Sequence, residues 1–165
     1  MTEIGRRNFM KGAAAAAAVT ILKPSVVFGY KNNSAVRMGF IGCGGRGTGV
    51  ISAMSSQAHV NIVALADLFE DKLVKARDTL NQCNGKNGFA GISKENIFQG
   101  SKAYLELLDS KDVDGVLIST PAYAHPEFLE AAVAAGKHVY CEKPVAIDAD
   151  GCKRVLKVAD SLDPN

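Results

Sequence analysis

A glycine-rich hexapeptide is the first group of residues whose spacing could support chemistry. The chain reads Gly42, Cys43, Gly44, Gly45, Arg46 and Gly47, which is the pattern G-x-G-x-x-G. In this pattern the first glycine permits a tight turn, the second lets backbone approach a pyrophosphate, and the third lets a helix pack closely on its strand. The free N–H groups and the macrodipole of that helix favour negative charge. The hexapeptide therefore predicts a loop that holds the pyrophosphate of a dinucleotide.

An acidic residue follows this loop at the spacing expected for the end of the next strand. Asp67 lies about 20 residues beyond Gly47 and closes the apolar run 60–66. A carboxylate at this position accepts hydrogen bonds from a ribose diol and repels a 2′-phosphate, and neither Leu68 nor Phe69 supplies a compensating cation. This pattern predicts NAD as the cofactor and makes NADP the less favoured one. Alternatively, Asp67 only caps a helix that starts at about Glu70.

Two further segments place polar side chains directly after apolar strands. The first contains Ser119, Thr120, Pro121 and His125, and the second is Glu142, Lys143 and Pro144. An ammonium such as that of Lys143 can hold a substrate hydroxyl and stabilise negative charge as the hydroxyl proton leaves. The alternatives are that Lys143 is a solvated surface lysine and that His125 caps the helix that Pro126 begins.

The elements that must position these residues alternate along the chain. Apolar runs predict strands at 36–41, 61–66, 97–99, 113–119 and 138–141, and helices at 44–56, 70–83, 102–108, 126–135 and 148–162. Ser101 is expected to cap the third helix, and 84–95 is expected to be a surface loop. This order predicts a doubly wound parallel α/β sheet, a three-layer Rossmann domain over 36–165, with ligands at the carboxyl ends of its strands.

The N-terminal segment has the composition of an export signal. Arg6 and Arg7 precede the uncharged stretch 12–22, which is too short for a bilayer that needs ~20 apolar residues. We interpret 1–29 as a twin-arginine signal and 30–35 as a linker. The translocase of that pathway is then a partner, and the protein is periplasmic or secreted. The cleavage point between 26 and 35 stays open, as does a retained membrane anchor.

Composition and charge exclude several other classes of protein. The chain has 165 residues, 47% of them hydrophobic and 22% charged, with a net charge of +2. The basic excess lies in the signal segment, so no nucleic-acid partner is indicated. The four cysteines, Cys43, Cys83, Cys141 and Cys152, form no C-x-x-C pair, and no metal site is predicted.

Taken together, the glycine loop, Asp67, the Thr-Pro-x-x-x-His segment and Glu-Lys-Pro resemble the N-terminal half of the Gfo/Idh/MocA oxidoreductases. The resemblance implies that 42–47 hold the pyrophosphate, Asp67 the adenine ribose, and 119–121 the nicotinamide side. It also implies that His125 contacts the nicotinamide ribose region and that Glu142 and Lys143 lie beside the reacting carbon. Lys143 is then the catalytic residue, and Glu142 could orient it through an ion pair.

The resemblance implies an exported enzyme that oxidises a sugar or polyol hydroxyl, such as that of a cyclitol, by hydride transfer to NAD. Members of the family continue into a second domain that supplies an acid/base histidine and the contacts of a homo-oligomer, and this sequence is expected to lack that domain. One alternative is a redox-assisted glycoside hydrolase, although the intact Glu-Lys-Pro favours a dehydrogenase. The other is an NAD-binding fragment that catalyses nothing alone or joins a separately encoded partner domain.

Overall fold

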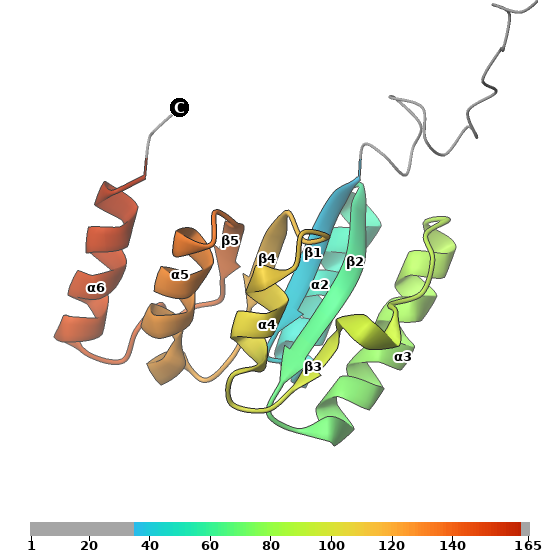
Figure 1. The fold of residues 1–165 in the computed structure, drawn as a ribbon, viewed down its shortest axis with the longest axis horizontal. Coiled ribbons are helices and arrows are strands. Elements are labelled where there is room, and N and C mark those ends of the chain that lie inside the picture. The colour runs from blue at the N-terminus through green and yellow to red at the C-terminus, as the bar shows by residue number, and fades with distance from the viewer. Residues whose placement is uncertain (1–34, 163–165) are drawn as a thin grey trace, which may run out of the picture. The chain divides into compact units, whose positions relative to one another are not determined.

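A parallel β-sheet forms the centre of the domain. The computed structural model describes residues 35–162 (Figure 1). The strands of this part are β1 (Val36–Ile41), β2 (Val60–Asp67), β3 (Ile97–Gln99), β4 (Gly115–Ile118) and β5 (His138–Cys141). All neighbouring strands run parallel in the order β3-β2-β1-β4-β5. The strand order reverses beside β1, as in a doubly wound fold, so ligands are expected at the carboxyl ends near that switch point.

Helices cover both faces of the sheet, which confirms the predicted three layers. They are α2 (Gly45–Gln57), α3 (Glu70–Lys86), α4 (Ala103–Asp109), α5 (His125–Ala134) and α6 (Ala149–Asp160), with 3₁₀ turns η3 (Lys94–Asn96) and η4 (Ala122–Ala124). In Figure 1, α4 and α5 lie in front of the sheet and α2 lies behind it. Two separate cores result, because each face of the sheet packs against its own helices.

The two cores explain why the strand segments are so apolar. One core joins β1 and β2 to α2 and α3 through residues such as Phe40, Ile51 and Leu80. The other joins β1 and β4 to α4 and α5 through residues such as Leu107 and Val116. A strand that is buried on both faces needs apolar side chains at nearly every position, which is the pattern of β4.

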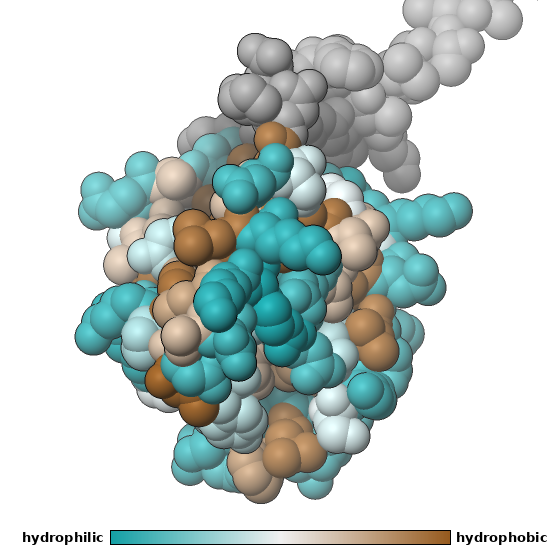
Figure 2. All heavy atoms as spheres, turned by 90° about the vertical axis from the view of Figure 1, so that its left-hand side faces the viewer, coloured by the Kyte–Doolittle hydropathy of each residue, from teal (hydrophilic) through white to brown (hydrophobic). Residues whose placement is uncertain are grey.

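Helix α6 packs beside α5, at the end of the domain where β5 is the edge strand of the sheet. Asp148 caps α6, because its Oδ1 accepts a hydrogen bond of 2.7 Å from the Gly151 N–H. Arg154 of α6 forms an ion pair of 2.5 Å with Glu130 of α5 and lowers the pKa of that carboxyl. Figure 2 shows this end as largely hydrophilic with hydrophobic patches, and Ile147 and Leu156 are among its exposed apolar side chains.

The structure corrects the predicted surface loop at 84–95. Helix α3 continues to Lys86, and Asn84 is fully buried. Its amide accepts a hydrogen bond from the Ile62 N–H at 3.1 Å and donates to the Ile62 carbonyl at 2.7 Å and to the Ala90 carbonyl at 3.0 Å. The side chain thus satisfies backbone groups that would otherwise be buried without partners.

Two smaller predictions were also wrong. Ser101 does not cap a helix, since α4 begins at Ala103 after Lys102 and has no side-chain cap. Strand β4 is shorter than the apolar run 113–119 that predicted it. The predicted signal 1–29 and nearly all of the linker 30–35 lie outside the described residues. Within 35–162, no helix is long and apolar enough to cross a membrane.

Candidate functional site

The glycine loop joins β1 to α2 at the carboxyl edge of the sheet. Gly42 has a φ of 88°, and a β-carbon there would lie 2.7 Å from the backbone of Ser119 and Thr120. A β-carbon at Gly47 would lie 2.6 Å from both the Phe40 ring and Ser119 Cβ. These contacts explain why the turn and the close packing of α2 on β1 need glycine at both positions. A β-carbon at Gly44, by contrast, would meet no described atom within 4 Å, so that position faces open space.

Asp67 ties the glycine loop to the end of β2. Its Oδ2 accepts a hydrogen bond of 2.6 Å from the Cys43 N–H, and its Oδ1 accepts one of 2.9 Å from the Phe69 N–H. The N-cap residue of α3 is Phe69, so Asp67 does not act as the helix cap that the alternative interpretation proposed. The carboxylate instead fixes the geometry between the loop and the strand end.

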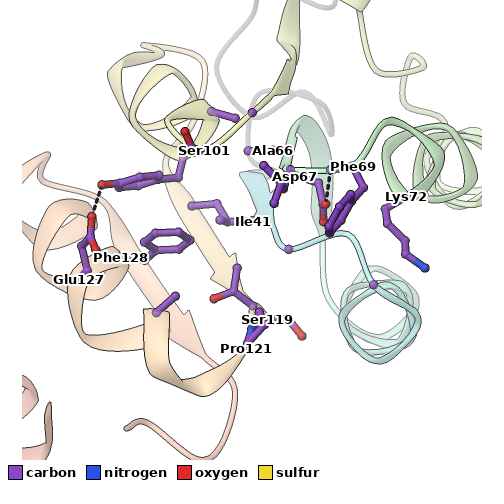
Figure 3. A pocket seen from close by; sticks show the side chains of 18 of the residues that line it. Ile41, Ala66, Asp67, Phe69, Lys72, Ser101, Ser119, Pro121, Glu127 and Phe128 are labelled. Carbon is purple, nitrogen blue, oxygen red and sulfur yellow. Dashed lines mark hydrogen bonds between the residues drawn. The ribbon is translucent and has the colours of Figure 1, made fainter. Parts of the chain in front are cut away.

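A cavity of about 440 Å³ opens between these loops at the carboxyl edge of the sheet. Of the predicted site residues, it brings together Gly42, Gly44, Asp67, Leu68, Ser119, Thr120 and Pro121. In Figure 3, Asp67 and Phe69 lie on one side of the cavity, and Glu127 and Phe128 lie on the opposite side. The cavity therefore spans the switch point between β1 and β4, where a doubly wound fold binds its ligand.

Several lining residues were missed by reasoning from the sequence. The rings of Tyr104 and Phe128 stack with their centroids 4.1 Å apart, and the Tyr104 hydroxyl donates to Glu127 Oε1 at 2.8 Å. Burial of the phenol, together with Glu127, raises the pKa of Tyr104. Lys72 also lines the cavity, and it supplies a cation that the neighbours of Asp67 do not. The only available signal was the position of these residues in the first turns of helices α3, α4 and α5.

The polar groups around the cavity fit a phosphate-bearing dinucleotide. Thr120 Oγ1 is buried and has no hydrogen-bond partner among the described residues. The N-cap of α2 is Gly44, and no side chain in the described part of the chain caps this helix. The first N–H groups of a helix have no acceptor inside the helix and favour an anion. Both features leave hydrogen-bonding capacity unused at the carboxyl edge of the sheet.

The Glu142 to Pro144 segment follows β5 at the same edge but does not line the cavity. Glu142 is only 6% exposed, and its N–H donates to the Ile118 carbonyl at 2.9 Å. Its carboxylate pairs with Arg46 of α2, with Arg46 Nη2 at 3.4 Å from Oε1. The ion pair considered between Glu142 and Lys143 is therefore replaced by one with Arg46. Lys143 is exposed, and its peptide bond to Pro144 is cis.

His125 lies beneath the loops rather than in the cavity. Its ring is 1% exposed, with Nδ1 at 2.8 Å from the Pro144 carbonyl oxygen and Nε2 at 2.8 Å from the Thr120 carbonyl oxygen. It is the first residue of α5 and makes no side-chain cap, so the capping alternative is not what the structure shows. The contact with the nicotinamide ribose implied by the resemblance stays a prediction.

The two thiols near the site, the buried Cys43 and the half-buried Cys141, both have raised pKa values. All four cysteines, which lie in the described part of the chain, are free, and no cluster of potential metal ligands occurs among residues 35–162. Burial raises the pKa of the Cys43 thiol, and the charge of Asp67 adds to the effect. Burial, followed by the charge of Glu142, raises the pKa of Cys141 to about 11. Neither thiol has the depressed pKa of a nucleophile.

The fold, the glycine loop and the cavity at the switch point together define a dinucleotide-binding Rossmann domain. A family model described as "Oxidoreductase family, NAD-binding Rossmann fold" (GFO_IDH_MocA) matches residues 36–163. The chain belongs to this Gfo/Idh/MocA family of NAD(P)-binding oxidoreductases. A second model, the signal sequence of the twin-arginine translocation pathway, matches residues 3–22. The chain therefore carries a signal for export to the periplasm or for secretion.

Curated relatives carry a different name. The chain is 32% identical, over 168 residues, to a "Glycosyl hydrolase family 109 protein" from Solibacter usitatus, with 98% of this chain and 37% of the relative covered. It is 28% identical to a protein of the same name from Shewanella baltica, with 100% of this chain and 39% of the relative covered. The chain thus spans less than half the length of these relatives.

Solved structures of oxidoreductases share the fold. KijD10, a 3-ketoreductase from Actinomadura kijaniata in complex with NADP, is 27% identical with a TM-score of 0.57, covering 76% of this chain and 36% of that one. The apo scyllo-inositol dehydrogenase from Lactobacillus casei is 21% identical with a TM-score of 0.60, covering 76% and 33%. The second likeness concerns the fold alone.

Proposed function

We propose that this chain is the cofactor-binding half of an exported oxidoreductase that uses NAD, in preference to NADP, to oxidise a hydroxyl of a sugar or cyclitol. The observation that carries the proposal is the cavity at the switch point, with the Asp67 carboxylate on one wall and the glycine loop beside it. A bound nicotinamide would accept the hydride from the carbinol carbon. The chain's own residues would hold the cofactor and position the hydroxyl.

The binding roles follow from the contacts at the carboxyl edge. The uncapped N-terminus of α2 and the open space at Gly44 suit the pyrophosphate. The half-buried Asp67 suits the adenine ribose diol and opposes a 2′-phosphate, which supports the preference for NAD. Lys72 lines the same cavity and would weaken that preference, since a cation can meet a 2′-phosphate.

Lys143 is the residue that we propose to touch substrate. Its side chain is exposed at the end of β5, while its neighbour Glu142 is buried and paired with Arg46. An ammonium at the edge of the site can orient a substrate hydroxyl and stabilise negative charge on its oxygen as the proton leaves. The sugar class of the substrate is supported by the names of the curated relatives, which are glycosyl hydrolase family 109 proteins.

The names of the curated relatives favour a second candidate function. In a redox-assisted glycoside hydrolase, transient oxidation of a sugar hydroxyl makes the neighbouring C–H acidic, so that the glycosidic bond breaks by elimination. A bound NAD would supply this transient oxidation with no net change in its redox state over the cycle. The 32% identity to a glycosyl hydrolase family 109 protein supports this candidate, whereas the Glu142-Lys143-Pro144 segment supports the dehydrogenase.

Calorimetric titration of the chain with NAD and with NADP tests the binding proposal. We expect saturable binding that is tighter for NAD, and we expect Asp67→Asn to weaken NAD about tenfold, because it removes a charged acceptor from the ribose site. Lys72→Gln should weaken NADP alone. Glu70→Gln, at an exposed position outside this cavity, is the matched control. Folded protein that binds neither cofactor would sink the proposal.

Net reduction of the cofactor separates the two candidate reactions. The chain, supplied with a second domain of the family, is incubated with NAD and a panel of sugars and cyclitols, and with aryl glycosides. Accumulation of reduced cofactor supports the dehydrogenase, and NAD-dependent release of the aryl group without net reduction supports the hydrolase. In either case Lys143→Met should abolish turnover while NAD binding is retained. Turnover that survives Lys143→Met would remove Lys143 from the mechanism.

A further inference from the structure

The exposed Lys143 stands between two residues that are both fixed to other elements. On its N-terminal side, Glu142 is buried, donates its N–H to the Ile118 carbonyl and pairs with Arg46. On its C-terminal side, the Pro144 carbonyl oxygen lies 2.8 Å from Nδ1 of His125. The Lys143 side chain is flexible, so the position of its ammonium group is restricted only if the backbone on both sides is fixed.

His125 connects this segment to the loop that follows β4. Its second ring nitrogen, Nε2, lies 2.8 Å from the Thr120 carbonyl oxygen. Strands β4 and β5 are direct neighbours. Their last residues, Ile118 and Cys141, are paired, and a loop follows each of them. Beyond the strand ends, the imidazole is the group that contacts both departing loops. A ring nitrogen that carries a proton donates to the carbonyl opposite it.

The ring of His125 is buried, and its two nitrogens lie against loop carbonyls. His125 is 1% exposed and is absent from the residues that line the cavity, although its contact partner Thr120 lines it. The hydroxyl of that same threonine is buried without a partner among the described residues. A contact that fixes the Thr120 carbonyl therefore restrains the backbone that carries this hydroxyl.

We propose that His125 is a positioning residue that sets the location of Lys143 relative to the 119–121 loop. This inference rests on the proposed function, in which 119–121 hold the nicotinamide side and Lys143 meets the substrate. With a proton on both ring nitrogens, the imidazolium would donate to one carbonyl from each loop and so hold the cofactor end and the lysine end in one geometry. Such support around a reactive group determines how accurately that group is placed.

The test uses the full chain and two ligands that probe different parts of the site. Under the proposed function, NAD would reach the 119–121 loop and Lys143, whereas ADP would occupy only the adenosine and pyrophosphate region. We expect His125→Phe, which keeps a ring but removes both nitrogens, to weaken NAD about tenfold and ADP less than about twofold. His125→Gln can still donate to one carbonyl and should lose only about threefold in NAD affinity. His138→Phe, at an exposed position in β5, is the matched control and should change neither affinity.

A second readout follows Lys143 directly. With saturating NAD, acetylation of Lys143 in the wild-type chain should slow about fivefold or more, because the nicotinamide end shields the amine, while ADP should have little effect. In His125→Phe, saturating NAD should no longer protect Lys143. The acetylated peptide is quantified by mass spectrometry. A ring that served only the stability of the fold would leave this protection unchanged once the cofactor is bound.

The outcomes separate this inference from the function on which it rests. If folded wild-type chain fails to bind NAD, the proposed function and this inference both fail. If the wild type binds NAD but His125→Phe weakens ADP as much as NAD, or leaves the protection of Lys143 intact, the positioning role alone is overturned. If His125→Phe does not fold, His125→Gln decides the matter: full protection of Lys143 in a variant with weakened NAD affinity would also overturn the role.

Discussion

The amino and carboxyl edges of the sheet differ in whether their polar groups have hydrogen-bond partners within the chain. At the amino edge, Arg37 donates three hydrogen bonds to Asp114. Its Nε lies 3.0 Å from Oδ2, its Nη2 lies 2.6 Å from Oδ1, and its backbone N–H donates to Oδ2 at 2.9 Å. Nearby, Lys137 Nζ donates to the carbonyls of Ser110 and Val113 at 2.7 and 2.8 Å. At the carboxyl edge, Thr120 Oγ1 has no partner among the described residues, and Gly44 faces open space.

This difference separates stability from function within one sheet. The amino edge satisfies its polar groups internally, and its charged side chains bridge β1, β4 and the turn before β5. The carboxyl edge leaves hydrogen-bonding groups unsatisfied around a cavity, which is favourable only if a ligand completes them. Substitutions at the amino edge should therefore change the free energy of unfolding alone, and those at the carboxyl edge should change binding.

In the glycine loop, by contrast, one substitution should change both the free energy of unfolding and the NAD affinity. Gly47→Ala puts a methyl group 2.6 Å from the Phe40 ring, so it should destabilise the fold by about 1–3 kcal/mol and also disturb NAD binding. Gly49→Ala in the same helix meets no described atom within 4 Å and should stabilise the fold by about 0.5–1 kcal/mol. Urea denaturation of both variants measures the difference. Equal effects would show that α2 does not pack on β1 as described.

The amino edge offers the converse case. Lys137→Met keeps much of the apolar stem but leaves the carbonyls of Ser110 and Val113 without their charged donor, which should cost about 2 kcal/mol. The NAD affinity of the folded variant should stay that of the wild type. Lys111→Met removes an exposed lysine nearby and serves as the control for charge. A weakened NAD affinity in Lys137→Met would mean that the two edges are coupled.

The sequence predicted the strands well because burial on both faces leaves a strong pattern. Strands β1, β3 and β5 have the predicted bounds, and β2 differs by one residue at each end. The carboxyl-edge location of Gly42, Asp67 and 119–121 then followed from the parallel topology, and the cavity confirms that these residues lie together. Local signals of this kind suffice when a function depends on where strands end.

The contacts between distant segments could not be predicted in this way. Asn84 was assigned to a loop because Gly85, Gly88 and Gly91 follow it among polar residues, yet it satisfies the backbone of β2, 22 residues away. His125 contacts Pro144 across 19 residues, and Tyr104 contacts Glu127 across 23. Such partners are chosen by tertiary packing, which neither hydrophobic periodicity nor residue spacing describes.

The ion pair of the amino edge should give a pH-dependent stability. The hydrogen bond and charge of Arg37 lower the pKa of the Asp114 carboxyl in the folded state. The contribution of this ion pair to the free energy of unfolding is therefore present above the unfolded pKa of about 3.9. It is lost as the pH falls through the lower pKa of the folded state. Because both side chains are more than a third exposed, Asp114→Asn should cost only about 1 kcal/mol at pH 7.

Urea melts between pH 2 and 7 measure this contribution, with Asp160→Asn, at an exposed position near the end of α6, as control. The gap between wild type and Asp114→Asn should close at the acid end of the series. A gap that stayed constant with pH would mean that the carboxylate contributes through shape and not through charge.

The smallest expected effect concerns how rigid the carboxyl edge is without a ligand. The Cys43 side chain is buried within the glycine loop and has a raised thiol pKa, and the Cys43 N–H donates to Asp67, while Cys152 is exposed on α6. At pH 8, iodoacetamide should modify Cys152 at least about ten times faster than Cys43, since alkylation needs an accessible thiolate. NAD should slow Cys43 further and leave Cys152 unchanged, as peptide mapping by mass spectrometry would show. Similar rates for the two thiols would mean that the loop opens readily in the free chain, so that the cavity wall is completed by the ligand itself.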